Sequence, residues 1–168
     1  QYLRYAKNLT IYEGTTAIQA NDLVGVKTAR DGGQVARAIA GRIEATEAAL
    51  AQRSSAASKS MLKHLRAARA AFVEVVDFVA GSTKASPNAV FAGSVAYLML
   101  AGNVVAGWQM ARALIVAEDQ RAEDAAFMDA KVATARFYAE HILSKVPGVR
   151  DSIIEGHAAV NDMALEAF

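Results

Sequence analysis

The sequence contains no cysteine among its 168 residues and only two prolines, Pro87 and Pro147. The absence of cysteine excludes disulfides, thiolate nucleophiles and cysteine-ligated metal sites, and it fits an intracellular protein. Acidic and basic side chains nearly cancel, 17 against 18, so the charge gives no reason to expect nucleic acid or an acidic membrane as a partner. The scarcity of proline and the abundance of alanine, leucine and charged helix formers favour long helices over sheet.

The first ten residues show neither an apolar signal core nor a basic transit pattern, and Gln1 stands where an initiator methionine is expected. We therefore expect the chain to be a piece of a longer polypeptide.

Apolar residues recur every three or four positions in several segments, which is the spacing of amphipathic helices. A first helix is expected from Thr15 or Thr16 to Arg30, where the sequence Asp-Gly-Gly ends it. Further helices are expected over residues 34–53, 61–81, from Pro87 onward, 128–146 and, as a short one, 151–160. Pro147 and Gly148 are expected to end the helix over 128–146. The pattern predicts an all-α fold, an antiparallel up-and-down bundle of four to five helices.

Two of these segments carry a well-defined apolar row, and each row predicts which side of its helix faces the core. The predicted core positions are Val35, Ile39, Ile43, Thr46 and Leu50 in one helix and Met61, Leu65, Ala68, Phe72, Val76 and Val79 in the next. Arg37, Arg42, Glu44 and Glu47 are assigned to the exposed surface.

No charged side chain occurs from Ala85 to Ala111, a length sufficient to cross a bilayer. Asn88, Asn103 and Gln109 and the lack of basic flanks favour a buried central helix of a soluble bundle instead. We expect no membrane span; the alternative, a membrane helix, predicts dependence on detergent.

One segment has the composition of a reactive site. It is the run IYEGTTAIQ at residues 11–19, continued by NDLVGVKT at 21–28 and Asp-Gly-Gly at 31–33. This order resembles the catalytic signature of the acyl-CoA dehydrogenases, and its continuation resembles the longer members that carry an extra helical domain. The resemblance implies that residues 1–33 end the flavin- and substrate-binding helical domain and that residues 34–168 form the additional C-terminal bundle.

The resemblance also implies roles for single residues. Glu13 is expected to be the general base that removes the α-proton of an acyl-CoA thioester while the β-hydrogen leaves as hydride to flavin, giving a trans-2-enoyl-CoA. Tyr12 and Gly14 are expected to contact substrate, and the flavin-contacting positions are Thr15, Thr16 and Ala17. Ala17 departs from the polar residue or glycine common in relatives, and Val26 stands where many long members have arginine.

The same resemblance implies FAD as the cofactor of the full-length enzyme, absent from this fragment, which we expect to be inactive by itself. It implies an acyl-CoA substrate, electron-transfer flavoprotein as electron acceptor, a homo-oligomer, and a soluble bacterial protein of the cytoplasm. No metal and no nucleic acid are implied.

Other interpretations of the same residues stay open at this stage. Without the resemblance, Tyr-Glu-Gly-Thr is a turn before a helix, and the chain is a non-catalytic oligomerisation or interaction module. His64, His141 and His157 lack the spacing of a metal site and are assigned to the surface or to interhelical hydrogen bonds. The basic set Lys59, Lys63, Arg66 and Arg69 is either a solvated face or a contact for CoA phosphate. The set Trp108, Tyr97, Phe91 and Met99 is assigned to core or interface packing, with a ligand pocket as the alternative.

Overall fold

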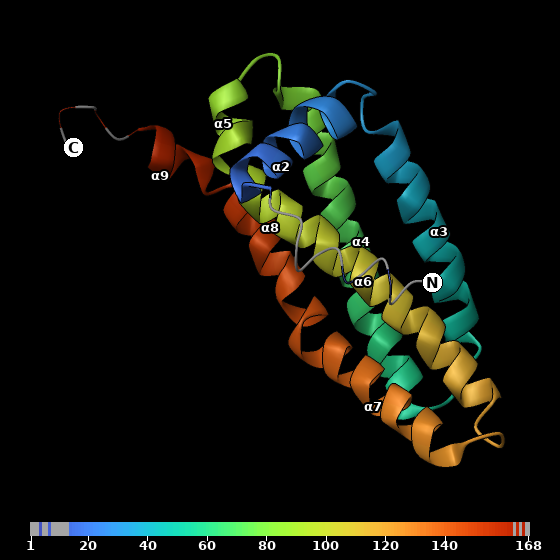
Figure 1. The fold of residues 1–168 in the computed structure, drawn as a ribbon. Helices are drawn as coiled ribbons and strands as arrows, with labels where there is room; N and C mark the ends of the chain where they lie inside the picture. The colour runs from blue at the N-terminus through green and yellow to red at the C-terminus, as the bar shows by residue number, and fades with distance from the viewer. Residues whose placement is uncertain (1–3, 5–6, 8–13, 163, 165, 167–168) are drawn as a thin grey trace.

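The computed structural model describes residues 4, 7, 14–162, 164 and 166, and within these residues the regular elements are all helices (Figure 1). Four rods run alternately in opposite directions along the chain, which confirms the all-α antiparallel bundle. The rods are α3 (Gln34–Ala51), α4 (Ala56–Ser82), α6 (Ser94–Asp119) and a fourth that consists of α7 (Ala125–His141), the 3-10 turn η3 (Leu143–Lys145) and α8 (Val146–Ile154). The short helices α5 (Pro87–Ala92) and α9 (His157–Asn161) lie at one end.

Helix α4 is the central helix, because it packs against α3, α6, α7 and α8. Its apolar row repeats every three or four residues and is buried throughout, from Met61 and Leu65 at no exposure to Val79 at 1%. The row predicted from the sequence for this helix is therefore confirmed. Helix α4 begins five residues earlier than predicted, where Ser55 accepts a hydrogen bond from the Ser58 backbone N–H at 2.9 Å and so caps the first turn.

Helix α6 is apolar on nearly all sides, yet it is buried on only one of them. Its core-facing row includes Tyr97, Leu100 and Val104, all at 1% exposure or less. Among the described residues it is the one helix long and apolar enough to cross a membrane, and 28% of its most apolar window is buried. A core helix passes the same test of length and composition, so this is weak evidence for a span. The expectation of a helix covered on all sides is wrong, because one row of α6 faces outward.

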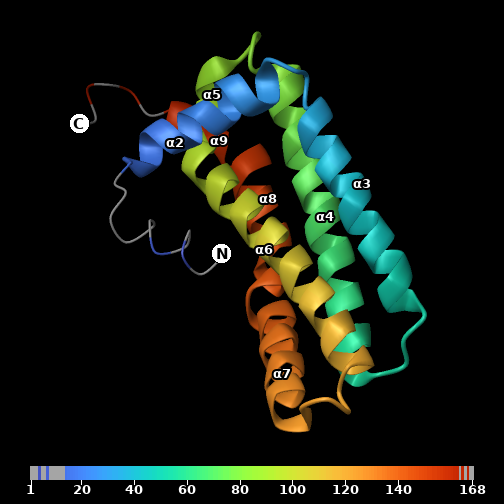
Figure 2. The ribbon, with the colours of Figure 1, turned by 45° about the vertical axis from the view of Figure 1, so that its right-hand side comes forward.

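Helix α2 (Thr16–Asp22) continues directly into a π-helical segment, η2 (Leu23–Ala29), and together they form one rod across the end of the bundle (Figure 2). Ala20 and Val24 on this rod are fully buried. The Thr28 and Tyr97 hydroxyls, both buried, share a hydrogen bond of 2.9 Å that joins η2 to α6. The predicted helix up to Arg30 is therefore present, with π rather than α winding in its second half.

The chain turns from η2 into α3 through Asp31, Gly32 and Gly33. Both glycines have positive φ, +65° and +79°, which side chains other than glycine rarely adopt. At Gly33 a Cβ atom would also lie 2.6 Å from Cγ1 of the buried Val76, so the turn packs directly on α4. The Asp31 carboxylate accepts hydrogen bonds from the backbone N–H groups of Gly33 and Val35 at 2.8 and 3.0 Å and caps α3.

The fourth rod is interrupted where the sequence predicted a continuous helix. Helix α7 ends at His141, and Pro147 lies in the first turn of α8 instead of ending its predecessor. Proline is tolerated there because the first-turn N–H groups have no partner within the helix, so the prediction for Pro147 was wrong. At the interruption, Leu143 packs onto α6 at Gly107, where an added Cβ would lie 2.6 Å from a Leu143 methyl carbon.

Candidate active site

The structure contains part of the segment with the catalytic signature. Tyr12 and Glu13, the predicted substrate contact and general base, lie outside the described residues. Gly14, Thr15 and Thr16, like Ala17 after them, are exposed at the beginning of α2. The described half of the signature therefore faces outward from the bundle, and none of its side chains contributes to the core.

Thr15 occupies the N-cap position of α2, as predicted, with extended backbone angles of φ −64° and ψ 133°. Its carbonyl oxygen accepts the Gln19 N–H at 3.2 Å, but its hydroxyl makes no capping hydrogen bond. Within the described part of the chain neither the Thr15 nor the Thr16 hydroxyl has a hydrogen-bond partner. Both exposed hydroxyls are therefore available to a group from outside this structure.

Gly14 is not required by the geometry of the bundle. An added Cβ would meet only the end of the flexible Gln19 side chain, 2.8 Å away, which can move at little cost. The fold of the described residues therefore supplies no reason for glycine at this position.

The helix that follows the signature is firmly attached to the bundle. Ala20 packs α2 against α6, Val24 is fully buried four residues later, and Thr28 makes the buried hydrogen bond to Tyr97. Burial raises the pKa of Tyr97, so ionisation of this phenol is disfavoured further than that of an exposed tyrosine. The position of the signature relative to α6 is thus set by packing along the whole α2–η2 rod.

Comparison with known proteins identifies the bundle. Residues 39–164 match the family described as "Acetyl-CoA dehydrogenase C-terminal like", and this match covers more than half of the chain. The chain belongs to the acyl-CoA dehydrogenase family. The match begins inside α3 and extends beyond α9, so it rests on the bundle and is independent of the signature at residues 11–19.

Two curated members of this family are similar over most of the chain. The chain is 43% identical over 163 residues to 3-methylmercaptopropionyl-CoA dehydrogenase of Ruegeria pomeroyi, covering 92% of the chain and 28% of that protein. It is 33% identical over 168 residues to the broad-specificity linear acyl-CoA dehydrogenase FadE5 of Mycobacterium tuberculosis, covering 91% of the chain and 26% of that protein. The chain thus spans about a quarter of the length of these acyl-CoA dehydrogenases.

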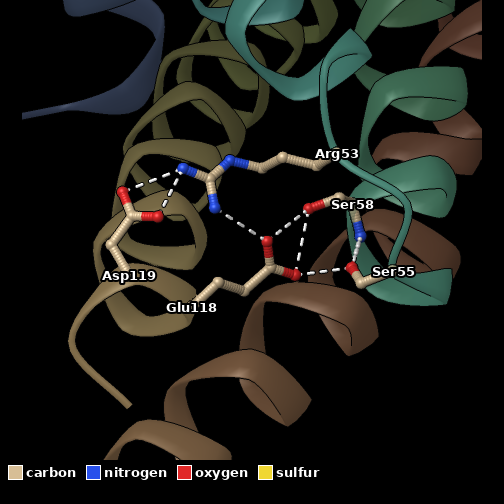
Figure 3. A network of polar contacts seen from close by, with 5 residues as sticks. All are labelled: Arg53, Ser55, Ser58, Glu118 and Asp119. Carbon is tan, nitrogen blue, oxygen red and sulfur yellow. Dashed lines mark hydrogen bonds and ion pairs between the residues drawn. The ribbon is translucent and has the colours of Figure 1, made fainter. Parts of the chain in front are cut away.

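A network of polar side chains in this acyl-CoA dehydrogenase domain (Figure 3) joins the end of α6 to the beginning of α4, at the end of the bundle opposite η2 (Figure 1). The Glu118 carboxylate on α6 accepts hydrogen bonds from the Ser55 and Ser58 hydroxyls on α4 and from the Arg53 guanidinium, the last at 3.1 Å. Arg53 also donates to both Asp119 oxygens at 2.8 Å. Each of these groups is satisfied by another member of the network, which indicates a structural junction. A serine directly before a helix is a cap signal that the sequence contains at Ser55. Nothing in the sequence indicates that Glu118, 63 residues away, is the partner of Ser55.

A second ion pair corrects a prediction. Glu47 was assigned to the surface of α3, but it is 2% exposed, and Arg69 on α4 donates to its two oxygens at 2.8 and 3.0 Å. Arg66 lies 3.8 Å from the same carboxylate. Arg69 therefore joins α3 to α4 and does not belong to a solvated face, whereas Arg66, Lys59 and Lys63 are exposed.

Trp108 and His141, two further candidate residues, make contacts within the bundle. Trp108 donates its indole N–H to the Thr46 hydroxyl at 2.8 Å and so packs α6 against α3. His141 stacks on Phe137 with ring centroids 4.5 Å apart. Within residues 14–162 and the few others described, no group of three histidine, aspartate or glutamate side chains is arranged to hold a metal ion.

Proposed function

We propose that this chain is the C-terminal part of a FAD-dependent dehydrogenase that converts an acyl-CoA thioester to its trans-2-enoyl-CoA. The observation that carries the proposal is the conjunction of two independent features: a bundle that belongs to the family, and a Glu-Gly-Thr signature directly before the helix that packs on this bundle. Residues 1–33 are proposed to complete the flavin- and substrate-binding domain, and residues 34–168 to form the additional bundle. Because α2 and η2 pack on the bundle, the boundary after residue 33 divides the chain by proposed function and does not divide it into two separately packed bodies.

Glu13 is the proposed general base. An α C–H of a thioester is a weak acid, so the carboxylate must be held in contact with it, and an apolar acyl chain around the carboxylate would raise its pKa and strengthen it as a base. The proton passes to Glu13 and the C–H electron pair forms the new double bond. The Thr15 and Thr16 hydroxyls would help to hold FAD, and the bound flavin would supply the acceptor for the β-hydrogen as hydride with its two electrons. Electron-transfer flavoprotein is the proposed acceptor from the flavin.

The described residues fit this assignment. The Thr15 and Thr16 hydroxyls are exposed and without partners among the described residues, as donors to a flavin would be, and Ala17 lies exposed beside them. Gly14 leaves space that the bundle itself does not need, which suits close approach of the thioester. Tyr12 is proposed to border the same pocket. Most of the flavin and CoA contacts are assigned to the part of the enzyme upstream, so the 168-residue chain alone is proposed to be inactive.

The substrates of the two relatives define the substrate class to be tested. One acts on 3-methylmercaptopropionyl-CoA and the other on linear acyl-CoA, so a panel should contain short thioether and straight-chain acyl thioesters. We propose a soluble, homo-oligomeric enzyme of the bacterial cytoplasm, in which α6 is a bundle helix and not a membrane span.

The decisive experiment is Glu13→Gln in the full-length enzyme, followed by anaerobic reduction of the flavin by acyl-CoA. Loss of the base is expected to slow reduction by about 10³-fold or more. The absorbance of the bound oxidised flavin before acyl-CoA is added should equal that of the parent, which shows that the variant still binds flavin. Glu123→Gln, which removes an exposed carboxylate from the α6–α7 connection, is the matched control and should reduce flavin at the normal rate. Normal reduction in Glu13→Gln would assign the base to another residue.

A further inference from the structure

The outward row of α6 changes character half-way along the helix. Its exposed positions follow the helical spacing of three or four residues, and they are Val95, Met99, Gly102, Val105, Gln109, Arg112, Val116 and Asp119. The first four have no polar side chain, although Val95 is 43% exposed and Met99 57% exposed. Polar side chains return at Gln109, so only the half of α6 nearest α2 presents an apolar surface.

An apolar groove of about 370 Å³ adjoins this half of the helix. Leu23 from η2, Val35 from α3 and Leu98 from α6 line it, together with Val105 and Gly102, which also belong to the outward row. Val35 was predicted to face the core but is 61% exposed, because α3 buries Ala36 and Ala40 instead. We use the name α6 apolar face for the exposed side chains Val95 and Met99 together with the groove residues Val35, Leu98 and Val105. Exposed apolar side chains gathered on one helix in this way are typical of an interaction site.

The position of α2 identifies what must lie against this face. Helix α2 packs on α6, and in Figure 1 both helices lie on the viewer's side of α4. Only two residues, Gly14 and Thr15, separate Glu13 from Thr16, the first residue of α2, and the three Cα steps from Glu13 to Thr16 span at most about 10 Å. If Glu13 touches the thioester, the domain that holds the thioester lies within about that distance of the beginning of α2.

The length of the relatives supplies the occupant. The chain covers 28% and 26% of the two curated proteins, so a body more than twice the size of this bundle remains to be placed in such an enzyme. On the basis of the proposed function, we infer that the α6 apolar face is the docking surface for the flavin- and acyl-CoA-binding part of the same polypeptide. The contact would hold the α2–η2 rod between two bodies and thereby fix where Glu13 points.

The first test places a photo-crosslinking amino acid at position 99 of the full-length enzyme. Position 116 on the same row is the matched control, because Val116 is 50% exposed and Met99 is 57% exposed. The inference expects a crosslink from position 99 to a peptide upstream of residue 1 in the same chain, with no increase in mass on a denaturing gel, and no such crosslink from position 116. A crosslink between two chains would make the face an interface between copies and overturn the inference, as would the absence of an upstream crosslink from position 99.

The second test is kinetic and uses Met99→Glu, with Val116→Glu as control and Met99→Leu as the conservative variant. Docking predicts at least a tenfold fall in the rate of flavin reduction by acyl-CoA for Met99→Glu, at unchanged oligomeric mass, and rates within twofold of the parent for the other two. Equal rates in all three variants would overturn the inference. The proposed function is judged separately, because Glu13→Gln distinguishes it even where position 99 proves irrelevant.

Discussion

The two ends of the bundle are held together by different kinds of interaction. At the end we call the Glu118 end, where α3 joins α4 and α6 joins α7, a carboxylate, an arginine and two serine hydroxyls satisfy one another (Figure 3). At the opposite η2 end, α2 and η2 are held by buried apolar side chains and by the Thr28–Tyr97 hydrogen bond. The first end is complete within the chain, whereas the second leaves the α6 apolar face uncovered. The Glu118 end is therefore a junction that stabilises the fold, whereas the η2 end carries a surface suited to a partner.

The largest effect on this comparison is expected from Glu118→Ala, which removes the acceptor of the network. Ser58, which is fully buried, would keep a hydroxyl without its carboxylate partner, and Arg53 would keep only Asp119. We expect a loss of about 2 to 3 kcal/mol in the free energy of unfolding, measured by chemical denaturation of the 168-residue chain. Glu123→Gln, which touches no network, should change it by less than about 0.5 kcal/mol. An equally small change in Glu118→Ala would show that the network does not stabilise this end.

A smaller effect is expected at the η2 end from Tyr97→Phe. The ring keeps its packing, but the buried Thr28 hydroxyl loses its partner, which should cost about 1 kcal/mol. Adding Thr28→Val removes the unpaired hydroxyl, so the double variant should lose less than the sum of the two single variants in the same denaturation measurement. Strictly additive losses would mean that the two hydroxyls do not interact in solution.

The smallest effect concerns the turn at the η2 end and depends on pH. Backbone N–H groups, that of Val35 first, lower the pKa of Asp31. A lowered pKa in the folded state gives a contribution to stability that is present above the unfolded value, about 4, and is lost as the pH falls through the folded value. Asp31→Asn should therefore be less stable than the parent at pH 7, and the difference should shrink under acid. Denaturation midpoints between about pH 2 and 7 test this, with Asp162→Asn as control. A difference that does not vary with pH would contradict the assignment.

The sequence predicted the bundle because its signals are local. In α4 the apolar row repeats without interruption, so the buried side of the helix can be counted off from Met61 onward. In α6 nearly every position is apolar, so periodicity cannot show which row faces the core, and the outward row with Val95 and Met99 was missed. The burial of Glu47 was missed for a related reason, since its partner Arg69 lies on the next helix and only folding brings the two together.

The catalytic signature behaved differently from the helices. Its order indicated the family, which the match over the bundle then showed independently, but the role of Glu13 stays a prediction because the groups it would act on do not belong to this chain. What the structure adds is local: exposed threonine hydroxyls without partners in the described residues, and a glycine that the bundle does not require. The order of residue types in a sequence can indicate a reaction. The distance between Glu13 and the thioester depends on this chain together with the part of the enzyme that binds the substrate.

The interruption in the fourth rod has a consequence for how the bundle comes apart. The helical hydrogen-bond ladder of α7 ends at Ile142, and the chain passes through a single 3-10 turn before α8 begins. Unwinding propagates along a helix from its end, residue by residue, and it stops where the ladder stops. Fraying that starts in α9 therefore stops at the break between Ile154 and His157, and unwinding within α8 would stop at Leu143, whose contact with Gly107 closes the seam against α6. Helix α9 can therefore loosen by itself, while α8 stays held by its packing on α4 and α6 and the rest of the bundle remains folded.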